Sequence, residues 1–148
     1  MIMKKIIVCV LLCLTMLQLR AADEGWLTDL AKAQAKAKAE KKMVLMDFTG
    51  SDWCPPCKAL HKNVLTAKEF VQFAGKNLVL VELDFPNGKP QSEELKKANK
   101  ALSEKFKIEG FPTVIVLDSE GKQLSKDVGY DGESAKDFVA KLAKLKKK

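Results

Sequence analysis

Residues 43–60 read MVLMDFTGSDWCPPCKAL, and this stretch decides the fold that we predict. It opens with an apolar run, residues 43–48, which is interrupted only by Asp47 and predicts a strand covered on both faces. After a short turn, a helix is expected to begin around the pair Cys54 and Cys57. Two cysteines separated by two residues at a strand–helix junction indicate a reversible disulfide. The unpaired N–H groups and the dipole of a helix start favour a thiolate at the first cysteine.

Outward from this stretch, helices and strands alternate along the chain. We expect helices over residues 23–42, 56–73, 92–106 and 133–144, and strands over residues 43–48, 77–85, 113–117 and 123–128. Strand–helix–strand steps imply parallel pairing, while the last two strands form an antiparallel hairpin. The predicted fold is therefore an α/β arrangement, a mixed central sheet with helices on both faces.

Two of these helices carry further predictions. The first has acids at its start and lysines towards its end, as the helix dipole prefers, and an apolar face that includes Trp26, Leu27, Leu30 and Ala31. The second is expected to break near residues 65–66. Both helices would then cover the central sheet.

Length and composition fit one globular domain. The chain has 148 residues, of which 47% are hydrophobic and 30% charged, which suits a single core and not a disordered chain. The net charge is +7, but three of the basic residues lie within the first 20 positions. The remainder carries only a modest positive surplus, so nothing in it indicates nucleic-acid binding.

The first 22 residues are typical of a secretory signal peptide. Two lysines precede an apolar run over residues 6–17, and small residues follow. The run is short for a bilayer span, so cleavage after Ala21 or Ala22 is favoured over an uncleaved anchor. We therefore predict a signal peptide over residues 1–22 and one domain over residues 23–148, located in the periplasm or secreted.

Removal of this segment changes the cysteine count. Cys9 and Cys13 lie within it, and bulky Leu12 argues against lipid attachment at Cys13. The mature chain then keeps only Cys54 and Cys57. A single closely spaced pair in an exported protein is more typical of a working disulfide than of a structural staple.

A second motif, Gly110-Phe111-Pro112-Thr113, lies far downstream and just before a predicted strand. Together with Trp53-Cys54-Pro55-Pro56-Cys57-Lys58, it makes residues 24–146 resemble the thioredoxin-fold thiol-disulfide oxidoreductases. The resemblance implies a thioredoxin-like fold and an enzyme that exchanges disulfides without a bound cofactor.

The resemblance also implies roles for individual residues. Cys54 is expected to be the nucleophile that forms a mixed disulfide, and Cys57 the buried thiol that resolves it. Pro112 is expected to follow a cis peptide bond and to pack against the disulfide. The backbone of Phe111 would pair with an extended substrate segment, and Trp53 would shield the site and contact partners.

Asp47 matches the buried acid of the family, which helps to move the proton of the resolving cysteine. A carboxyl in an apolar strand is costly without a partner or a task, and a pKa raised by desolvation suits proton transfer. The alternative is an aspartate that is merely bonded to backbone. Two departures stand out: residues 49–52 are one residue longer than in thioredoxin, and Glu82 replaces a lysine. If Asp47 and Glu82 lie beside each other as this match implies, their carboxylates approach and raise the pKa of one of them further.

The prolines between the cysteines bear on the direction of electron flow. Pro55 and Pro56 have no N–H, so two donors are missing near Cys54. We expect a thiolate nearer thioredoxin's pKa of about 7 than the roughly 3.5 of the strong periplasmic oxidant. This favours a reductase or an electron relay over an enzyme that introduces disulfides, which is the alternative.

Metal and haem chemistry are not expected. His61 shares a helical face with Cys57, but the predicted mature chain offers no further Cys or His to complete a zinc site. Lys58 stands where covalent haem attachment needs histidine.

The expected partners are exported proteins that contain cysteines, together with a membrane-bound thiol donor that recycles the pair. We expect a monomer, no nucleic acid and no stable membrane insertion after cleavage. An alternative from another class is a peptide-binding or chaperone-like module of the same fold, in which redox turnover is incidental. A metal carrier is the third possibility.

Overall fold

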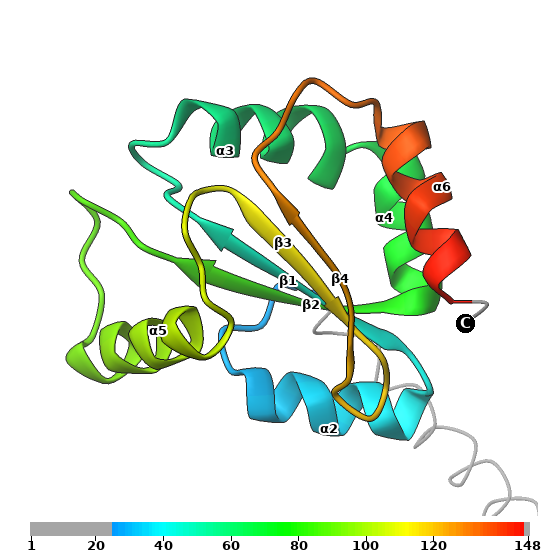
Figure 1. Ribbon diagram of the computed structural model, residues 1–148, viewed down its shortest axis with the longest axis horizontal. Coiled ribbons are helices and arrows are strands. Elements are labelled where there is room, and N and C mark those ends of the chain that lie inside the picture. The colour runs from blue at the N-terminus through cyan, green and yellow to red at the C-terminus, as the bar shows by residue number, and fades with distance from the viewer. Residues whose placement is uncertain (1–24, 147–148) are drawn as a thin grey trace, which may run out of the picture.

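The computed structural model describes residues 25–146 as a four-stranded sheet with helices on both faces (Figure 1). The predicted signal peptide and the first two residues of the predicted mature chain lie outside these described residues. The predicted α/β class and mixed sheet are confirmed.

The sheet has the strand order β2-β1-β3-β4. Its strands are β1 (Met43–Thr49), β2 (Leu78–Asp84), β3 (Thr113–Leu117) and β4 (Gln123–Val128). β1 and β2 are parallel, and β3 is antiparallel to both β1 and β4. All seven residues of β1 are buried, as its near-continuous apolar sequence predicts for a central strand.

The direction of β3 corrects one prediction. The step from β2 through α5 (Glu93–Lys105) was expected to give a parallel strand, but β3 is antiparallel to β1, and Thr113 pairs with Phe48. After α5 the chain re-enters the sheet at the carboxyl end of β1 instead of crossing back to its start. The ends of β1 and β2 and the beginning of β3 therefore lie at one edge of the sheet, here called the carboxyl edge.

The helices form two layers. The layer on one face comprises α3 (Pro55–Leu60), the π-helical segment His61–Leu65, α4 (Lys68–Asn77) and α6 (Ala135–Leu145), and the other layer comprises α2 (Leu30–Glu40) and α5. Side chains alternate along β1: Leu45 packs with the α3 layer, whereas Val44, Met46 and Phe48 pack with the α2 layer. Asp47, two residues beyond Leu45, consequently faces the α3 layer.

The first helix starts later than the sequence predicts. Helix α2 begins at Leu30, where the Asp29 carboxylate caps it by accepting the N–H of Lys32 at 3.1 Å. Leu27 is extended instead: its N–H donates to the carbonyl of Leu80, and its own carbonyl accepts the N–H of Glu82. β2 is the outermost strand of the sheet, so backbone N–H and C=O groups on its outer side have no partner strand. A residue in extended conformation can form hydrogen bonds with these groups, whereas a helical residue cannot.

The predicted apolar face of α2 is also wrong. The buried residues of the helix are Ala33 and Ala37, while Ala31 is exposed and Leu30 is partly buried. Small alanine side chains allow the helix backbone to lie close to the sheet.

The predicted break near residues 65–66 is confirmed. Helix α3 continues into the π-helical segment, which ends at Leu65, and α4 begins at Lys68. The Thr66 hydroxyl donates to the carbonyls of His61 and Lys62, at 3.1 and 3.0 Å. This hydrogen bonding terminates the first helical run and turns the chain towards α4.

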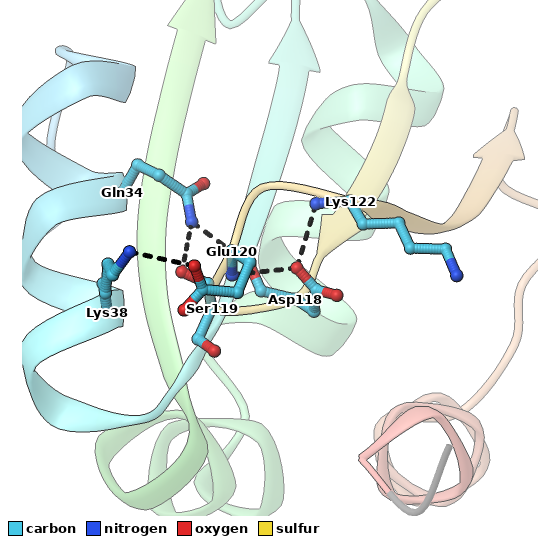
Figure 2. Close-up of polar contacts among 6 residues, drawn as sticks. All are labelled: Gln34, Lys38, Asp118, Ser119, Glu120 and Lys122. Atoms are coloured by element: carbon cyan, nitrogen blue, oxygen red, sulfur yellow. Dashed lines mark hydrogen bonds and ion pairs between the residues drawn. The ribbon is translucent and has the colours of Figure 1, made fainter.

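The β3–β4 turn is tied to α2 at the end of the sheet opposite the carboxyl edge. Figure 2 shows Gln34 Nε2 donating to the carbonyls of Asp118 and Ser119, at 3.2 and 2.8 Å. Lys38 Nζ lies 2.9 Å from the Glu120 carboxylate, and the Asp118 carboxylate accepts two N–H groups of its own turn. The exposed ion pair adds little, so the amide bonds of Gln34 do most of the anchoring.

Candidate active site

Cys54 and Cys57 form a disulfide at the carboxyl edge, with a Cα–Cα distance of 5.3 Å. Each residue is only 3% exposed, although Pro55 and Pro56 between them are exposed. Cys54 is the N-cap of α3, and its Sγ accepts the N–H of Cys57 at 3.4 Å. The pair thus lies at the strand–helix junction that the sequence predicts.

The carboxylate of Asp52 binds the loop that follows β2. It accepts the N–H groups of Asn87, Gly88 and Lys89, at 3.0, 2.6 and 3.2 Å. These hydrogen bonds hold the pKa of Asp52 below its ordinary value. Sequence reasoning missed this contact, since neither an aspartate in a turn nor a Pro-Asn-Gly loop indicates which loop it will meet.

Ser51 makes a second connection between the two loops. Its N–H and its hydroxyl donate to the Asp84 carboxylate, at 2.9 and 2.6 Å, and its hydroxyl oxygen accepts from Lys89 Nζ at 2.9 Å. The longer segment of residues 49–52 is therefore fixed against residues 84–89 by charged groups. Asp84 is left as a hydrogen-bonded carboxylate at the end of β2.

Trp53 joins an aromatic cluster beside the disulfide. Its Nε1 donates to the Phe85 carbonyl at 2.7 Å, and its ring meets the ring of Phe111 edge-on, with centroids 5.9 Å apart. Phe111 also contacts Phe85, with a centroid distance of 5.2 Å. Trp53 remains 41% exposed, so the cluster presents an apolar surface to solvent. Phe85 was not singled out in the sequence, where it reads only as the end of a strand.

The Gly110–Thr113 motif lies next to this cluster through Phe111. The peptide bond between Phe111 and Pro112 is cis, and Pro112 is buried. The Pro112 carbonyl accepts the N–H of Gly129, and the Thr113 hydroxyl donates to the Gly110 carbonyl at 2.7 Å. The structure thus brings the two motifs together at the carboxyl edge.

Gly50 permits the close approach of Trp53. A Cβ at this position would lie 2.7 Å from Nε1 and from Cζ2 of the indole, well inside van der Waals contact. We expect Gly50→Ala to lower the free energy of unfolding by about 1–3 kcal/mol, because the ring must move out of its packed position. Urea unfolding followed by circular dichroism measures the change.

Gly75→Ala is the matched control for this variant. No atom lies within 4 Å of a Cβ added at Gly75, which is in helix α4, so alanine should stabilise the protein by roughly 0.5–1 kcal/mol. Equal unfolding midpoints for the two variants would contradict the packing argument.

Asp47 is a buried carboxyl on the sheet face that the cysteine-bearing helix covers. It is 5% exposed, and its Oδ1 accepts no hydrogen bond from the described residues. Burial first, and then the charges of Glu82 and Asp84, raise the pKa of Asp47 to about 7.

Glu82 lies beside Asp47, because the two are register partners in the parallel strands β1 and β2. Burial and the Asp84 charge raise the pKa of Glu82, while His61 and Lys89 act in the opposite direction. The predicted register holds, and the expectation that Glu82 raises the pKa of Asp47 further is confirmed. His61 itself is exposed.

Two kinds of feature are absent from residues 25–146. No group of three His, Cys, Asp or Glu side chains in that range is placed to hold a metal ion. Within the same range, no helix combines the length and the apolar character that a membrane crossing needs.

A family model described as a thioredoxin-like domain matches residues 30–146. The chain belongs to the thioredoxin-like family. The prediction of a thioredoxin-like fold is therefore confirmed by the family match as well as by the observed architecture. The matched range contains the elements from β1 to α6 and both motifs.

Several named proteins are similar to this thioredoxin-like chain. Disulfide bond reductase DsbH of Chlamydia pneumoniae is 37% identical over 122 residues, which are 82% of this chain and 72% of that protein. Thioredoxin-related protein DsbJ of the same organism is 31% identical over 147 residues, and the match spans only 42% of its length. A solved structure titled DsbH Oxidoreductase superposes with a TM-score of 0.77 at 35% identity, covering 88% of this chain and 89% of that one.

The family, these relatives and the Cys54–Cys57 disulfide identify this thioredoxin-like protein as a thiol-disulfide oxidoreductase. The predicted enzyme class is confirmed.

Proposed function

We propose that this protein is a reductase of exported proteins, which passes electrons from the reduced Cys54–Cys57 pair to client disulfides. The observation that carries the proposal is the sparse set of donors around Cys54 Sγ. Pro55 and Pro56 occupy the first two helical positions and have no N–H, so the N–H of Cys57, at 3.4 Å, is the first that the helix supplies. A thiolate with few donors is weakly stabilised, and a weakly stabilised reduced form makes the pair reducing.

The buried carboxyls add to this effect. Asp47 and Glu82 lie on the sheet face that α3 covers, and negative charge near a thiol disfavours its thiolate. The relative DsbH is named as a disulfide bond reductase, which supports the same direction of electron flow.

In the proposed cycle, the Cys54 thiolate attacks a client disulfide, forms a mixed disulfide and releases one client thiolate. Asp47 takes the proton of Cys57, whose thiolate then attacks Cys54 Sγ. This step closes the Cys54–Cys57 disulfide and releases the second client thiolate. Both client thiolates take protons from water, and two electrons have moved to the client. No bound cofactor enters these steps.

The client-binding surface in this proposal is the aromatic cluster with the cis-proline loop. Trp53 is exposed beside the disulfide, and Phe111 precedes β3. In this proposal the backbone of Phe111 pairs with an extended client segment. Pro112 would hold that segment against the cysteines. The apolar character of Trp53 and Phe111 favours clients with apolar residues near their disulfides.

Export rests on residues 1–22, which we propose as a cleaved signal peptide that leaves residues 23–148 as a monomeric domain in the periplasm or outside the cell. Outside the cytosol the oxidised pair needs a new source of electrons, and we assign this role to a membrane-bound thiol donor. Cysteine-containing exported proteins are the clients.

The reduction potential of the pair tests the proposed direction. Equilibration of the protein with glutathione buffers is expected to give a value near that of thioredoxin, roughly −270 mV, and far from the roughly −120 mV of the strong periplasmic oxidant. Pro56→His, which adds an N–H and a cationic donor near Cys54, is expected to raise the potential. A wild-type value near the oxidant's would make this protein a disulfide-introducing enzyme instead.

The binding-module alternative needs a separate measurement. In that case a variant with both cysteines replaced by serine would still bind unfolded client chains as tightly as the wild type does. If the double variant no longer retains client chains as the wild type does, the result supports the redox function, because retention then depends on the cysteines.

A further inference from the structure

Asp47 and Glu82 form a side-by-side pair of carboxyls under the helix that carries Cys57. They are register partners in neighbouring parallel strands, which run alongside each other in Figure 1, and both alternate onto the face covered by the α3 layer. Asp47 is buried, whereas Glu82 is only half-buried. The pair therefore extends from the interior of the protein towards solvent.

The charged groups around this pair come from three segments. From β2, Asp84 acts on both carboxyls, and its side chain accepts hydrogen bonds from the N–H and hydroxyl of Ser51. His61 of the π-helical segment and Lys89 of the loop after β2 act on Glu82 with the opposite sign. On the other side of Asp47, β3 places apolar Val114.

These surroundings give the two carboxyls different access to solvent. Asp47 lies on the sheet face beneath the helix that carries Cys57, but it is buried and its Oδ1 has no hydrogen-bond partner among the described residues. It cannot exchange a proton freely with water. Glu82 is more accessible, and His61 and Lys89 partly oppose the rise of its pKa. Two neighbouring carboxylates resist being ionised together, so their titrations are coupled.

We propose that Asp47 and Glu82 share one proton near neutral pH, so that Asp47 receives the proton of Cys57 and Glu82 passes it on to water. The proposal rests on the proposed function and concerns the step in which Cys57 resolves the mixed disulfide. There the S–H bond of Cys57 breaks, its proton goes to Asp47, and its electron pair forms the bond to Cys54 Sγ. The client sulfur leaves as a thiolate. Glu82 acts through Asp47 and is a positioning residue.

The raised pKa of Asp47 supports this pairing, because the charge of Glu82 is one of its causes. The pKa of Glu82 is raised by burial and by the charge of Asp84. Asp47, with a pKa of about 7 to which Glu82 contributes, titrates in the range in which a proton carrier must work.

The test compares Glu82→Gln with the wild type in two measurements. The first follows the Asp47 side-chain carboxyl by ¹³C NMR from pH 4 to 9. The second follows the pH dependence of insulin disulfide reduction by the reduced protein. A neutral glutamine removes the repulsion, so both the Asp47 titration and the acidic limb of the rate profile are expected to shift down by roughly one pH unit.

Three further variants make the result specific. Glu82→Asp keeps the charge and is expected to stay close to the wild-type profile. Glu104→Gln removes the same charge from an exposed position on α5 and should shift neither measurement. The comparison is repeated in a His61→Gln background, because histidine titrates in the same pH range.

The outcomes distinguish failure of the shared-proton proposal from failure of the proposed reductase function. Unchanged Asp47 titration and rate profile in Glu82→Gln would overturn the shared proton while leaving the reductase function intact. A shift in Glu82→Asp as large as that in Glu82→Gln would also overturn it, since charge would not be the cause. If the wild type fails to reduce insulin at any pH, the proposed function fails, yet the NMR titration still decides whether the pair is coupled.

Discussion

Cys57→Ser is expected to stop disulfide turnover and to leave client proteins attached to Cys54. The variant keeps the proposed nucleophile at the start of α3 but loses the thiol that would release the client, so the reaction should end at the mixed disulfide. Loss of a residue that acts as part of a catalytic unit lowers the rate by roughly a thousandfold or more. Insulin reduction measures the loss, and non-reducing electrophoresis with mass spectrometry detects the trapped species.

Cys54→Ser is the matched control. It also removes turnover, but it is expected to trap no client, because Cys57 lies within α3 whereas Cys54 is at its N-cap. If the Cys57 variant turned over normally, or if Cys54→Ser trapped clients equally well, the assignment of nucleophile and resolving thiol would be wrong.

Asp47→Asn is expected to make the oxidised protein more stable at pH 8 and slower in catalysis. The pKa of Asp47 is about 7 in the folded protein against an ordinary value of 3.8, so the folded state holds the proton more tightly than the unfolded state. Between about pH 4 and pH 7 the folded state therefore loses stability as pH rises, and above pH 7 the loss is complete. Removing this ionisation should recover about 2–4 kcal/mol at pH 8.

Urea unfolding at pH 4, 6 and 8 measures this effect. The wild type should lose stability over that range relative to Asp47→Asn, and the two should be closest at pH 4. An amide cannot accept the Cys57 proton, so insulin reduction by the variant should fall by roughly a hundredfold. A variant less stable than the wild type at pH 8 would show that the carboxylate is satisfied in a way that the structure does not contain.

Asp52→Asn is the control of opposite sign. The pKa of Asp52 is lowered by the three N–H groups that its carboxylate accepts, so its contribution to stability is present at neutral pH and is lost as pH falls through its folded pKa. Neutralising it should destabilise the protein at pH 8, where neutralising Asp47 stabilises it.

The features that the sequence predicted are those encoded in local patterns. The apolar run of β1 predicted a central strand, and the interruption at Asp47 predicted a buried acid within it. The spacing of Cys54 and Cys57 at a strand–helix junction was enough to predict their bond. Alternation along β1 and β2 then places Asp47 and Glu82 on the same face of the sheet.

The features that the sequence did not reveal depend on where distant segments meet. The direction of β3 is set by where the chain leaves α5, and helix periodicity carries no information about that. Leu27 reads as part of a helical face, but the open edge of β2 takes it as an extended residue. Likewise, the loop that Asp52 binds is 35 to 37 residues away, and the side chain alone does not specify it.

The hydrogen bonds from Ser51, Asp52 and Trp53 to residues 84–89 mean that the smallest transferable unit of this enzyme is discontinuous in sequence. A designer who grafted only the cysteine loop onto another scaffold would move the sulfurs without the loop that holds the residues before them. The grafted carboxylate of Asp52 would face water, and the indole of Trp53 would lose its carbonyl partner. Redesign of this oxidoreductase must therefore treat the two loops as one module.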